Sequence, residues 1–189
     1  MHNRLLIASL AASSLLVGCA ADVGSEEDAR AGWAPTNAAL AAGASSAQSS
    51  AGAVAPDENP VLRAGNAVSV NYDHSCSSGS INYNGNYFFD ASDIGSAVEF
   101  DYQADFDKCS DGSLTIDGSL DYALSAEASD AGSNLTYTYS GELVWSGSVE
   151  GSCAIDMTGV FSATSTSAGV SYSGKICGFD AAVTLNVSI

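Results

Sequence analysis

The C-terminal two-thirds of the sequence predicts an all-β fold, an antiparallel up-and-down meander of about eight strands. From residue 67 to the end, apolar and polar residues alternate with the period of a strand that has one buried face. The connections at 77–79, 110–112 and 130–133 are rich in Ser, Asp and Gly and are too short to hold a crossover helix. Consecutive strands are therefore expected to pair antiparallel.

The alternation divides this part of the chain into eight strands, each with apolar side chains on one face. In order along the chain, we expect these strands at 68–74, 81–89, 98–106, 114–126, 135–149, 153–163, 170–176 and 179–189. No helix is expected to cover the apolar face that they share. We place this β domain at residues 67–189.

A single sheet with one exposed apolar face is not stable alone, so the face must curl on itself or meet a second layer. Five glycines fall on it near mid-strand, where they permit sharp bends: Gly85, Gly118, Gly141, Gly159 and Gly174. We expect a small closed or partly open barrel, with a two-layer β-sandwich as the alternative. A barrel spanning the outer membrane is disfavoured, because so much Gly and Ala makes a poor lipid-facing surface.

Four cysteines lie at or near the junctions from odd to even strands, which share one rim of a meander: Cys76, Cys109, Cys153 and Cys177. Four is an even number of cysteines, and it predicts two disulfides if the chain is exported, as the N-terminus described below indicates. A zinc site is disfavoured, because the cysteine spacings are wide and His74 is the only histidine after the N-terminal segment. Proximity favours Cys76 with Cys109 and Cys153 with Cys177. A closed barrel would also allow Cys76 with Cys177 and Cys109 with Cys153.

The N-terminus has the form of an export signal. Arg4 precedes an apolar run at 5–17 that is too short to span a bilayer. The run ends in Leu16-Val17-Gly18-Cys19, which resembles the lipobox of bacterial lipoproteins. Residues 1–18 are therefore expected to be a signal peptide. An ordinary signal peptide cut near Ala20 or Ala21 is the alternative.

The resemblance covers only the first 19 or 20 residues, and it implies a location and an anchor. Cys19 would carry diacylglycerol and a further acyl chain such as palmitate, which together hold a protein stably on a membrane. Ala20 follows the cysteine where lipoproteins retained at the inner membrane carry Asp. The resemblance thus implies the bacterial outer membrane, with the protein facing the periplasm or the cell surface.

Residues 19–66 are predicted to form a lipidated, disordered tether. They are rich in Ala, Gly and Ser, contain every proline of the chain and have few large apolar side chains. Such a tether would span roughly 40 Å, enough to hold the β domain clear of the head groups. A short helix at 36–47, capped by Thr36, would be marginal in water.

Charge excludes one class of partner. Without the signal peptide, four basic residues remain against 22 acidic ones, a net charge of −18. Nucleic-acid binding relies on clustered Lys and Arg, which are lacking here. We therefore expect no nucleic-acid partner.

Carboxylates on the polar faces of the third and fourth strands are the one candidate metal site. They are Glu99, Asp101, Asp105, Asp107, Asp117 and Asp121. Such a group of oxygen ligands would attract calcium. The alternative is a solvated acidic face that keeps the sheet soluble and discourages edge pairing. No other cofactor is expected.

Aromatic side chains with polar tips concentrate on the apolar face. They are Tyr72, Tyr83, Tyr102, Tyr122, Tyr137, Tyr139, Trp145 and Tyr172. They would either line a cavity for a small hydrophobic or amphipathic ligand, or fill a core.

No catalytic residue is nominated. Asp73 and Ser75 flank His74, but adjacent strand residues point to opposite faces, so neither can orient the ring. We expect a non-enzymatic, lipid-anchored envelope protein with a structural or hydrophobic-ligand-binding role. A hydrolase of the envelope or an extracellular polymer is one alternative, and a calcium-dependent surface interaction module is the other.

Overall fold

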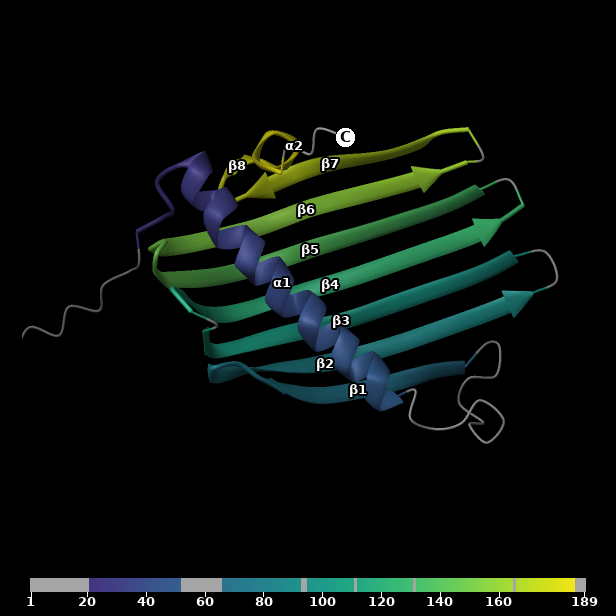
Figure 1. Ribbon diagram of the computed structural model, residues 1–189, viewed down its shortest axis with the longest axis horizontal. Coiled ribbons are helices and arrows are strands. Elements are labelled where there is room, and N and C mark those ends of the chain that lie inside the picture. Colours follow the sequence, from purple (N-terminus) through teal and green to yellow (C-terminus); the bar gives the residue numbers. More distant parts are fainter. Residues whose placement is uncertain are drawn as a thin grey trace, which may run out of the picture.

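The computed structural model describes residues 21–51, 66–92, 95–110, 112–130, 132–164 and 166–185. One eight-stranded sheet dominates the molecule (Figure 1). Its strands are β1 (Asn66–Ser75), β2 (Ser78–Ser92), β3 (Gly95–Ser110), β4 (Leu114–Ser129), β5 (Gly132–Gly147), β6 (Gly151–Ala163), β7 (Ala168–Ile176) and β8 (Phe179–Asp180). Each strand pairs antiparallel with the next along the chain. The predicted meander is confirmed.

The sheet is open, because β1 and β8 are its two edges and no hydrogen bonds join them. A helix, α1 (Glu26–Ala51), crosses one face diagonally, from β8 at its N-terminal end to β1 at its C-terminal end (Figure 1). We call this the apolar face. The expectation that no helix covers it was wrong, and α1 supplies the second layer that a one-sided sheet requires.

The prediction that residues 19–66 form a disordered tether is wrong for 26–51. Ser25 caps α1, because its Oγ accepts a hydrogen bond from the Asp28 amide at 3.1 Å and donates to the Asp28 carboxylate at 2.7 Å. Acidic residues in the first turn favour the positive end of the helix dipole. Thr36 does not cap a helix; it lies within α1 and donates to the Gly32 carbonyl at 2.8 Å.

Packing against the sheet holds α1 in place. Its buried face has two large apolar side chains, Trp33 and Leu40, among small residues. Glycines let sheet rings approach closely: a Cβ added to Gly32 would lie 2.3 Å from the Trp145 ring, and one added to Gly43 would lie 2.1 Å from the Tyr83 hydroxyl. The sheet thus contributes large side chains, and the helix contributes small residues that leave room for them. Because its contact residues are mostly small, the helix sequence alone looks too weakly apolar to fold.

The last predicted strand, 179–189, is also corrected. Only Phe179 and Asp180 pair with β7, and the chain then turns into α2 (Ala181–Thr184). The Asp180 carboxylate accepts hydrogen bonds from the amides of Ala182 and Val183 at 2.9 and 3.3 Å, which starts a helix instead of continuing the strand. Residues 186–189 lie outside the described part of the chain.

Both disulfides are present, and they join sequence neighbours: Cys76 to Cys109 and Cys153 to Cys177, with Cα atoms 5.4 and 4.2 Å apart. All four cysteines lie at one end of the sheet, which we call the disulfide rim. This pairing suits an open sheet, because no bond joins the first hairpin to the last. A β-bulge between Phe106 and Cys109 reverses the strand alternation, so that both side chains are buried.

The predicted signal peptide at 1–18 and the predicted lipidation site Cys19 lie outside the described residues. Neither helix that the structure describes is both long and apolar enough to cross a bilayer.

Candidate functional site: the apolar face and its open patch

Rows of side chains cross the apolar face, each made of residues that the strand register places side by side. The first of four successive rows, counted away from the disulfide rim, contains Tyr83, Ala104, Leu120, Ile155 and Ile176; the rows of Ile81 with Phe106 and of Ile116 with Trp145 lie nearer that rim. The next contains Tyr102, Tyr122, Tyr139 and Met157. The third contains Tyr87, Phe100, Leu124, Tyr137 and Tyr172. The outermost contains Val98, Ala126, Leu135, Phe161 and Val170.

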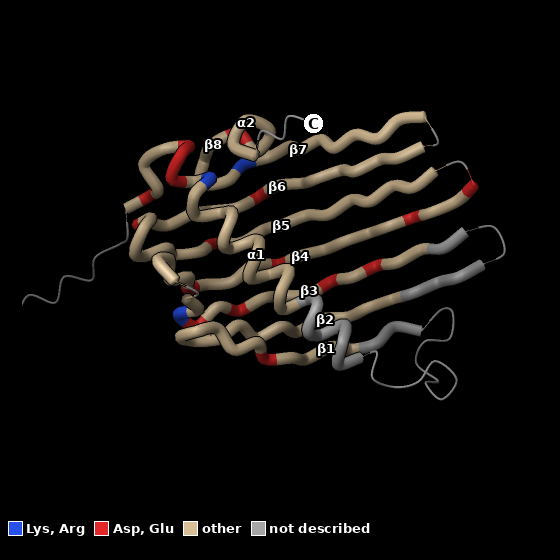
Figure 2. Tube along the Cα trace, viewed as in Figure 1, with Lys and Arg blue, Asp and Glu red and all other residues tan. Residues whose placement is uncertain are grey.

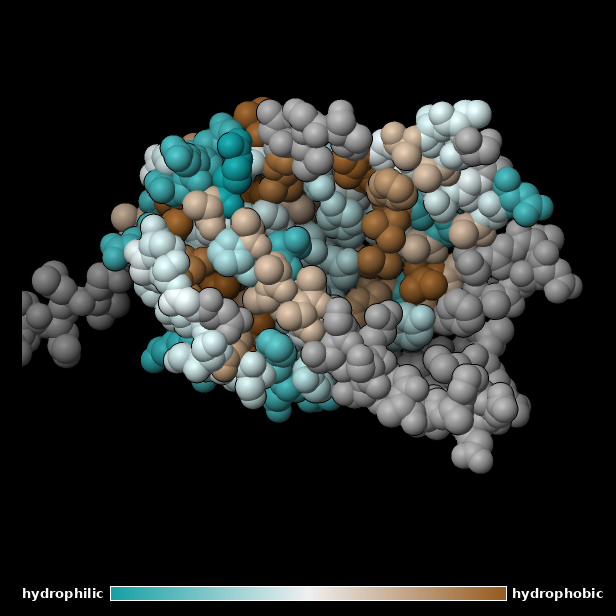
Figure 3. Space-filling view, in the orientation of Figure 1, coloured by the Kyte–Doolittle hydropathy of each residue, from teal (hydrophilic) through white to brown (hydrophobic). Residues whose placement is uncertain are grey.

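Burial decreases row by row away from the disulfide rim. Side chains of the first row are at most 2% exposed, whereas those of the third row are only partly buried. In the outermost row, Phe161 is 38% exposed. Figure 3 shows hydrophobic side chains at the surface beside α1. We define the open patch as Phe100, Leu124, Leu135, Tyr137, Phe161 and Tyr172, which lie on the apolar face toward the end opposite the disulfide rim.

Ring contacts link the buried rows to the open patch. The Tyr102 and Tyr122 ring centroids are 4.8 Å apart, and those of Tyr122 and Tyr139 are 4.7 Å apart. From this row the contacts reach Phe100, 4.9 Å from Tyr102, and Tyr137, 5.9 Å from Tyr139. Aromatic pairs at these separations add to the stability that burial alone provides. The rings therefore form one connected layer from β2 to β7.

The covered part of this layer is fixed by α1. Trp33 meets Tyr139 edge to face, with ring centroids 5.0 Å apart. The Tyr139 hydroxyl bonds to the Asn37 side chain at 3.3 Å, and the Tyr83 hydroxyl donates to the Ala39 carbonyl at 3.2 Å. These contacts satisfy two tyrosine hydroxyls that the helix removes from water. The covered rows are therefore a packed core.

Burial makes these tyrosines harder to ionise. It raises the pKa of Tyr122 to about 12, and it raises the pKa of Tyr83, Tyr102 and Tyr139 well above the ordinary tyrosine value. Burial and a hydrogen bond with Tyr172 likewise raise the pKa of Tyr137. The face thus presents rings with protonated hydroxyls, which suit an uncharged apolar or amphipathic molecule.

Six of the eight predicted aromatic residues divide between covered and open parts of this face. Tyr83, Tyr102, Tyr139 and Trp145 are buried, whereas Tyr137 and Tyr172 belong to the open patch. The other two, Tyr72 and Tyr122, are partly buried against the core. No site role was predicted for Phe100, Leu124, Leu135 or Phe161. Their positions along the strands were the available signal, because strand alternation places all four side chains on the same face as the tyrosines.

The predicted carboxylate group lies on the opposite face. Glu99, Asp101, Asp105, Asp107, Asp117 and Asp121 are all exposed. The register places Asp121 opposite Gln103 and Asp105 opposite Ser119, whereas Asp117 lies opposite the bulge that contains Asp107. Among the described residues, no group of three or more acidic, histidine or cysteine side chains is arranged to hold a metal ion.

His74 is partly buried near the end of β1, paired with Ile81 of β2. The neighbouring Asp73 is engaged elsewhere, because its carboxylate accepts a hydrogen bond from the Asn82 side chain at 2.7 Å. This arrangement matches the expectation that Asp73 does not orient the His74 ring.

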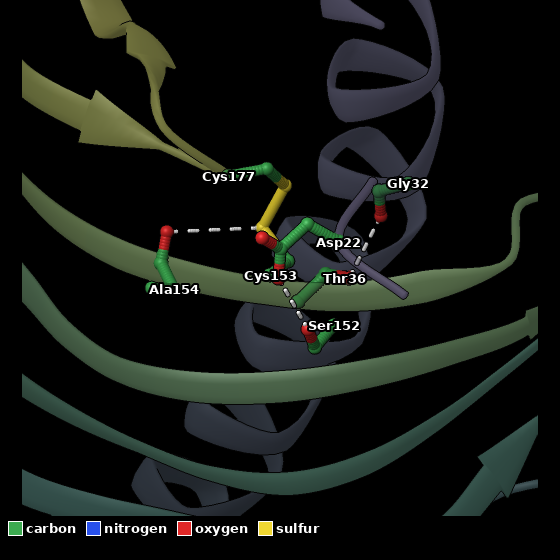
Figure 4. Close-up of a disulfide and its surroundings, with 7 residues drawn as sticks. All are labelled: Asp22, Gly32, Thr36, Ser152, Cys153, Ala154 and Cys177. Carbon is green, nitrogen blue, oxygen red and sulfur yellow. Dashed lines mark hydrogen bonds between the residues drawn. A yellow bond between two sulfur atoms is a disulfide. The ribbon is translucent and has the colours of Figure 1, made fainter. Parts of the chain in front are cut away.

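The N-terminal end of the described chain is bound to the disulfide rim (Figure 4). The Ser152 amide donates to the Ala21 carbonyl at 2.9 Å, and the Val23 amide donates to the Ser152 carbonyl at 3.1 Å. The Ser152 hydroxyl also donates to the Asp22 carboxylate at 2.9 Å. We call this parallel bridge, which lies beside the Cys153–Cys177 disulfide, the N-terminal latch.

No family model matches the sequence, and searches of curated proteins and of solved structures also gave no match.

Proposed function

We propose that this protein is a non-enzymatic lipoprotein of the bacterial outer membrane, anchored through Cys19, that binds a small hydrophobic molecule at the open patch. The anchor rests on the lipobox resemblance of residues 16–19. The binding role rests on one observation: the aromatic layer continues past the edge of α1, so that its inner part is core while its outer part is only half-buried, with Phe161 38% exposed.

The chemistry of the patch supports an uncharged ligand. Apolar rings and aliphatic side chains contribute the contact area, and Tyr137 and Tyr172 add two hydroxyl groups to it. The net charge of −18 after signal removal disfavours an anionic ligand. A neutral lipid or another apolar metabolite fits this combination.

Two neighbouring residues on β6 allow a matched test. Phe161 and Val160 are 38% and 37% exposed, but they point to opposite faces of the sheet. We expect the neutral dye N-phenylnaphthylamine to fluoresce on binding the wild type, and Phe161→Glu to weaken its affinity about tenfold or more, because a charge then enters an apolar contact. Val160→Glu introduces the same charge and should bind the dye normally.

Equal affinities of the two variants would contradict the assignment of the open patch. If a second copy of the chain occupied this surface instead of a ligand, sedimentation would show a dimer that Phe161→Glu dissociates. The anchor is tested separately, by intact mass spectrometry of protein purified from membranes. The expected mature chain begins at Cys19 and carries acyl chains, and an unmodified N-terminus would refute lipid anchoring.

A further inference from the structure

The N-terminal latch fixes where the chain leaves the folded body. Val23 is 4% exposed and belongs to the core, and its amide and the Ala21 carbonyl both bond to Ser152 at the start of β6. Gly151 makes room for this contact: a Cβ there would lie 2.6 Å from the Ala21 carbonyl oxygen, and its φ of 140° is one that residues with a side chain rarely adopt. The local sequence is therefore suited to holding residues 21–23 against the disulfide rim.

The latch leaves almost no free chain between the body and the anchor. Cys19 precedes Ala21 by two residues, which reach at most about 7 Å when fully extended. A disordered tether of 19–66 would have allowed separations of roughly 40 Å. The folded body must instead lie next to whatever holds Cys19.

From this geometry we propose that the disulfide rim is a membrane-facing surface that rests on the lipid head groups, with the open patch directed away from the bilayer. The inference depends on the proposed lipid anchor at Cys19. It goes further by assigning the docking surface and the orientation of the anchored protein.

Charge distribution is compatible with this surface. The three basic residues that the structure describes, Arg30, Lys108 and Lys175, all lie toward the disulfide rim (Figure 2). The exposed lysines can meet lipid phosphates, whereas the Arg30 guanidinium donates to the Thr184 and Val183 carbonyls and pairs with Glu26. Carboxylates of Asp22, Glu150 and the first turn of α1 share this end. The covalent anchor and the latch, rather than net charge, therefore determine the orientation.

The orientation has a consequence for ligand access. Phe161 lies nine residues along β6 from Ser152, a distance of roughly 30 Å at the usual rise of a strand. The open patch is then held above the head groups instead of being inserted among them. Its ligand would arrive from the aqueous side, delivered by a carrier or by an apposed membrane.

Two labelling sites at opposite ends of β6 test the orientation. Ser148 lies in the β5–β6 turn at the disulfide rim and Ser167 lies in the β6–β7 turn at the far end, and both are exposed. Each is changed to cysteine in the full-length lipidated protein, Ser148→Cys or Ser167→Cys, and labelled with a maleimide donor dye. The four structural cysteines do not compete, because they are in disulfides, and Cys19 carries the lipid.

The labelled proteins are reconstituted into phosphatidylethanolamine and phosphatidylglycerol vesicles that carry a head-group acceptor dye. Energy transfer should be about threefold or more stronger from position 148 than from 167, because the sites differ in height by roughly 40 Å. Inserting about twenty Gly and Ser residues between Ala20 and Ala21 should reduce transfer from 148, because the linker adds roughly 25 Å. Equal transfer from both positions, or no effect of the linker, would overturn the inference.

Vesicle flotation separates this inference from the proposed function. Protein that floats with vesicles but gives equal transfer from both positions is anchored without the proposed orientation. Protein that does not float has no working anchor, and then the lipid-anchored function and the orientation both fail.

Discussion

Gly32 of α1 lies directly over the ring of Trp145 in β5, so close that an added Cβ would be 2.3 Å from the ring atoms Cε3 and Cζ3. Trp145 is only 1% exposed. The contact shows how the helix and the sheet pack together. The helix has no side chain at this position, so the indole ring of the sheet can lie against its backbone.

The first prediction concerns this contact. In an exposed helix position, Gly→Ala stabilises by up to about 1 kcal/mol. At Gly32 the new methyl group must displace Trp145, so we expect Gly32→Ala to lower the free energy of unfolding by about 1 to 3 kcal/mol. Urea denaturation measures the change. Gly24→Ala is the control, because no atom lies within 4 Å of a Cβ there; a stabilised Gly32→Ala would show that α1 does not pack on Trp145.

The second prediction concerns the helix cap. Ser25→Ala removes the Oγ that accepts from the Asp28 amide, and it should destabilise the protein by about 1 kcal/mol. Ser171→Ala, at an exposed site on β7, should have little effect. Thermal unfolding of the two variants under the same conditions provides the comparison. Equal melting temperatures would argue against a folded start of α1 at Glu26.

The third prediction concerns disulfide connectivity. Peptide mapping without reduction should recover Cys76 linked to Cys109 and Cys153 linked to Cys177. Replacing either pair by alanine should cost about 3 to 4 kcal/mol, because the closed loops span 33 and 24 residues. A peptide joining Cys76 to Cys177 would instead indicate a closed barrel.

The fourth prediction concerns alkaline pH. Tyr83, Tyr102 and Tyr139 have pKa values raised by burial, so in the folded protein they keep protons that the unfolded chain loses above pH 10. Their stabilising contribution is complete below pH 10 and declines as the pH rises toward the folded values. For these three tyrosines together, the free energy of unfolding falls by about 4 kcal/mol per pH unit. The tyrosinate absorbance that these three tyrosines contribute should therefore appear together with unfolding, and its appearance near pH 10 in the folded state would contradict the burial.

Much of the sheet was predictable because strand alternation is a local property. The alternation of apolar and polar residues was enough to place Tyr83, Leu120 and Phe161 on the apolar face of the sheet, without any tertiary contact. The cysteines were predictable as two bonded pairs at one rim for the same reason. Sequence proximity favoured the observed connectivity but left a second pairing open, because the choice depends on whether the two edges of the sheet meet.

The helix and the limits of the site were not predictable by the same reasoning. The sequence Ser25-Glu26-Glu27-Asp28 carries a capping signal, but the face of α1 consists largely of Ala and Gly, which is also typical of disordered segments. Its stability comes from rings that belong to the sheet. The division of the aromatic residues into core and open patch depends in turn on where α1 crosses.

The sequence by itself determined the all-β meander, the acidic character and the rim that carries the cysteines, because alternation, composition and spacing are properties of the chain read in order. Only the tertiary structure decided that residues 26–51 form a helix, that the sheet stays open and that Ala21 is latched to Ser152. These features depend on contacts between segments far apart in the chain, and the energy of such contacts is set by shape complementarity, which no local pattern records.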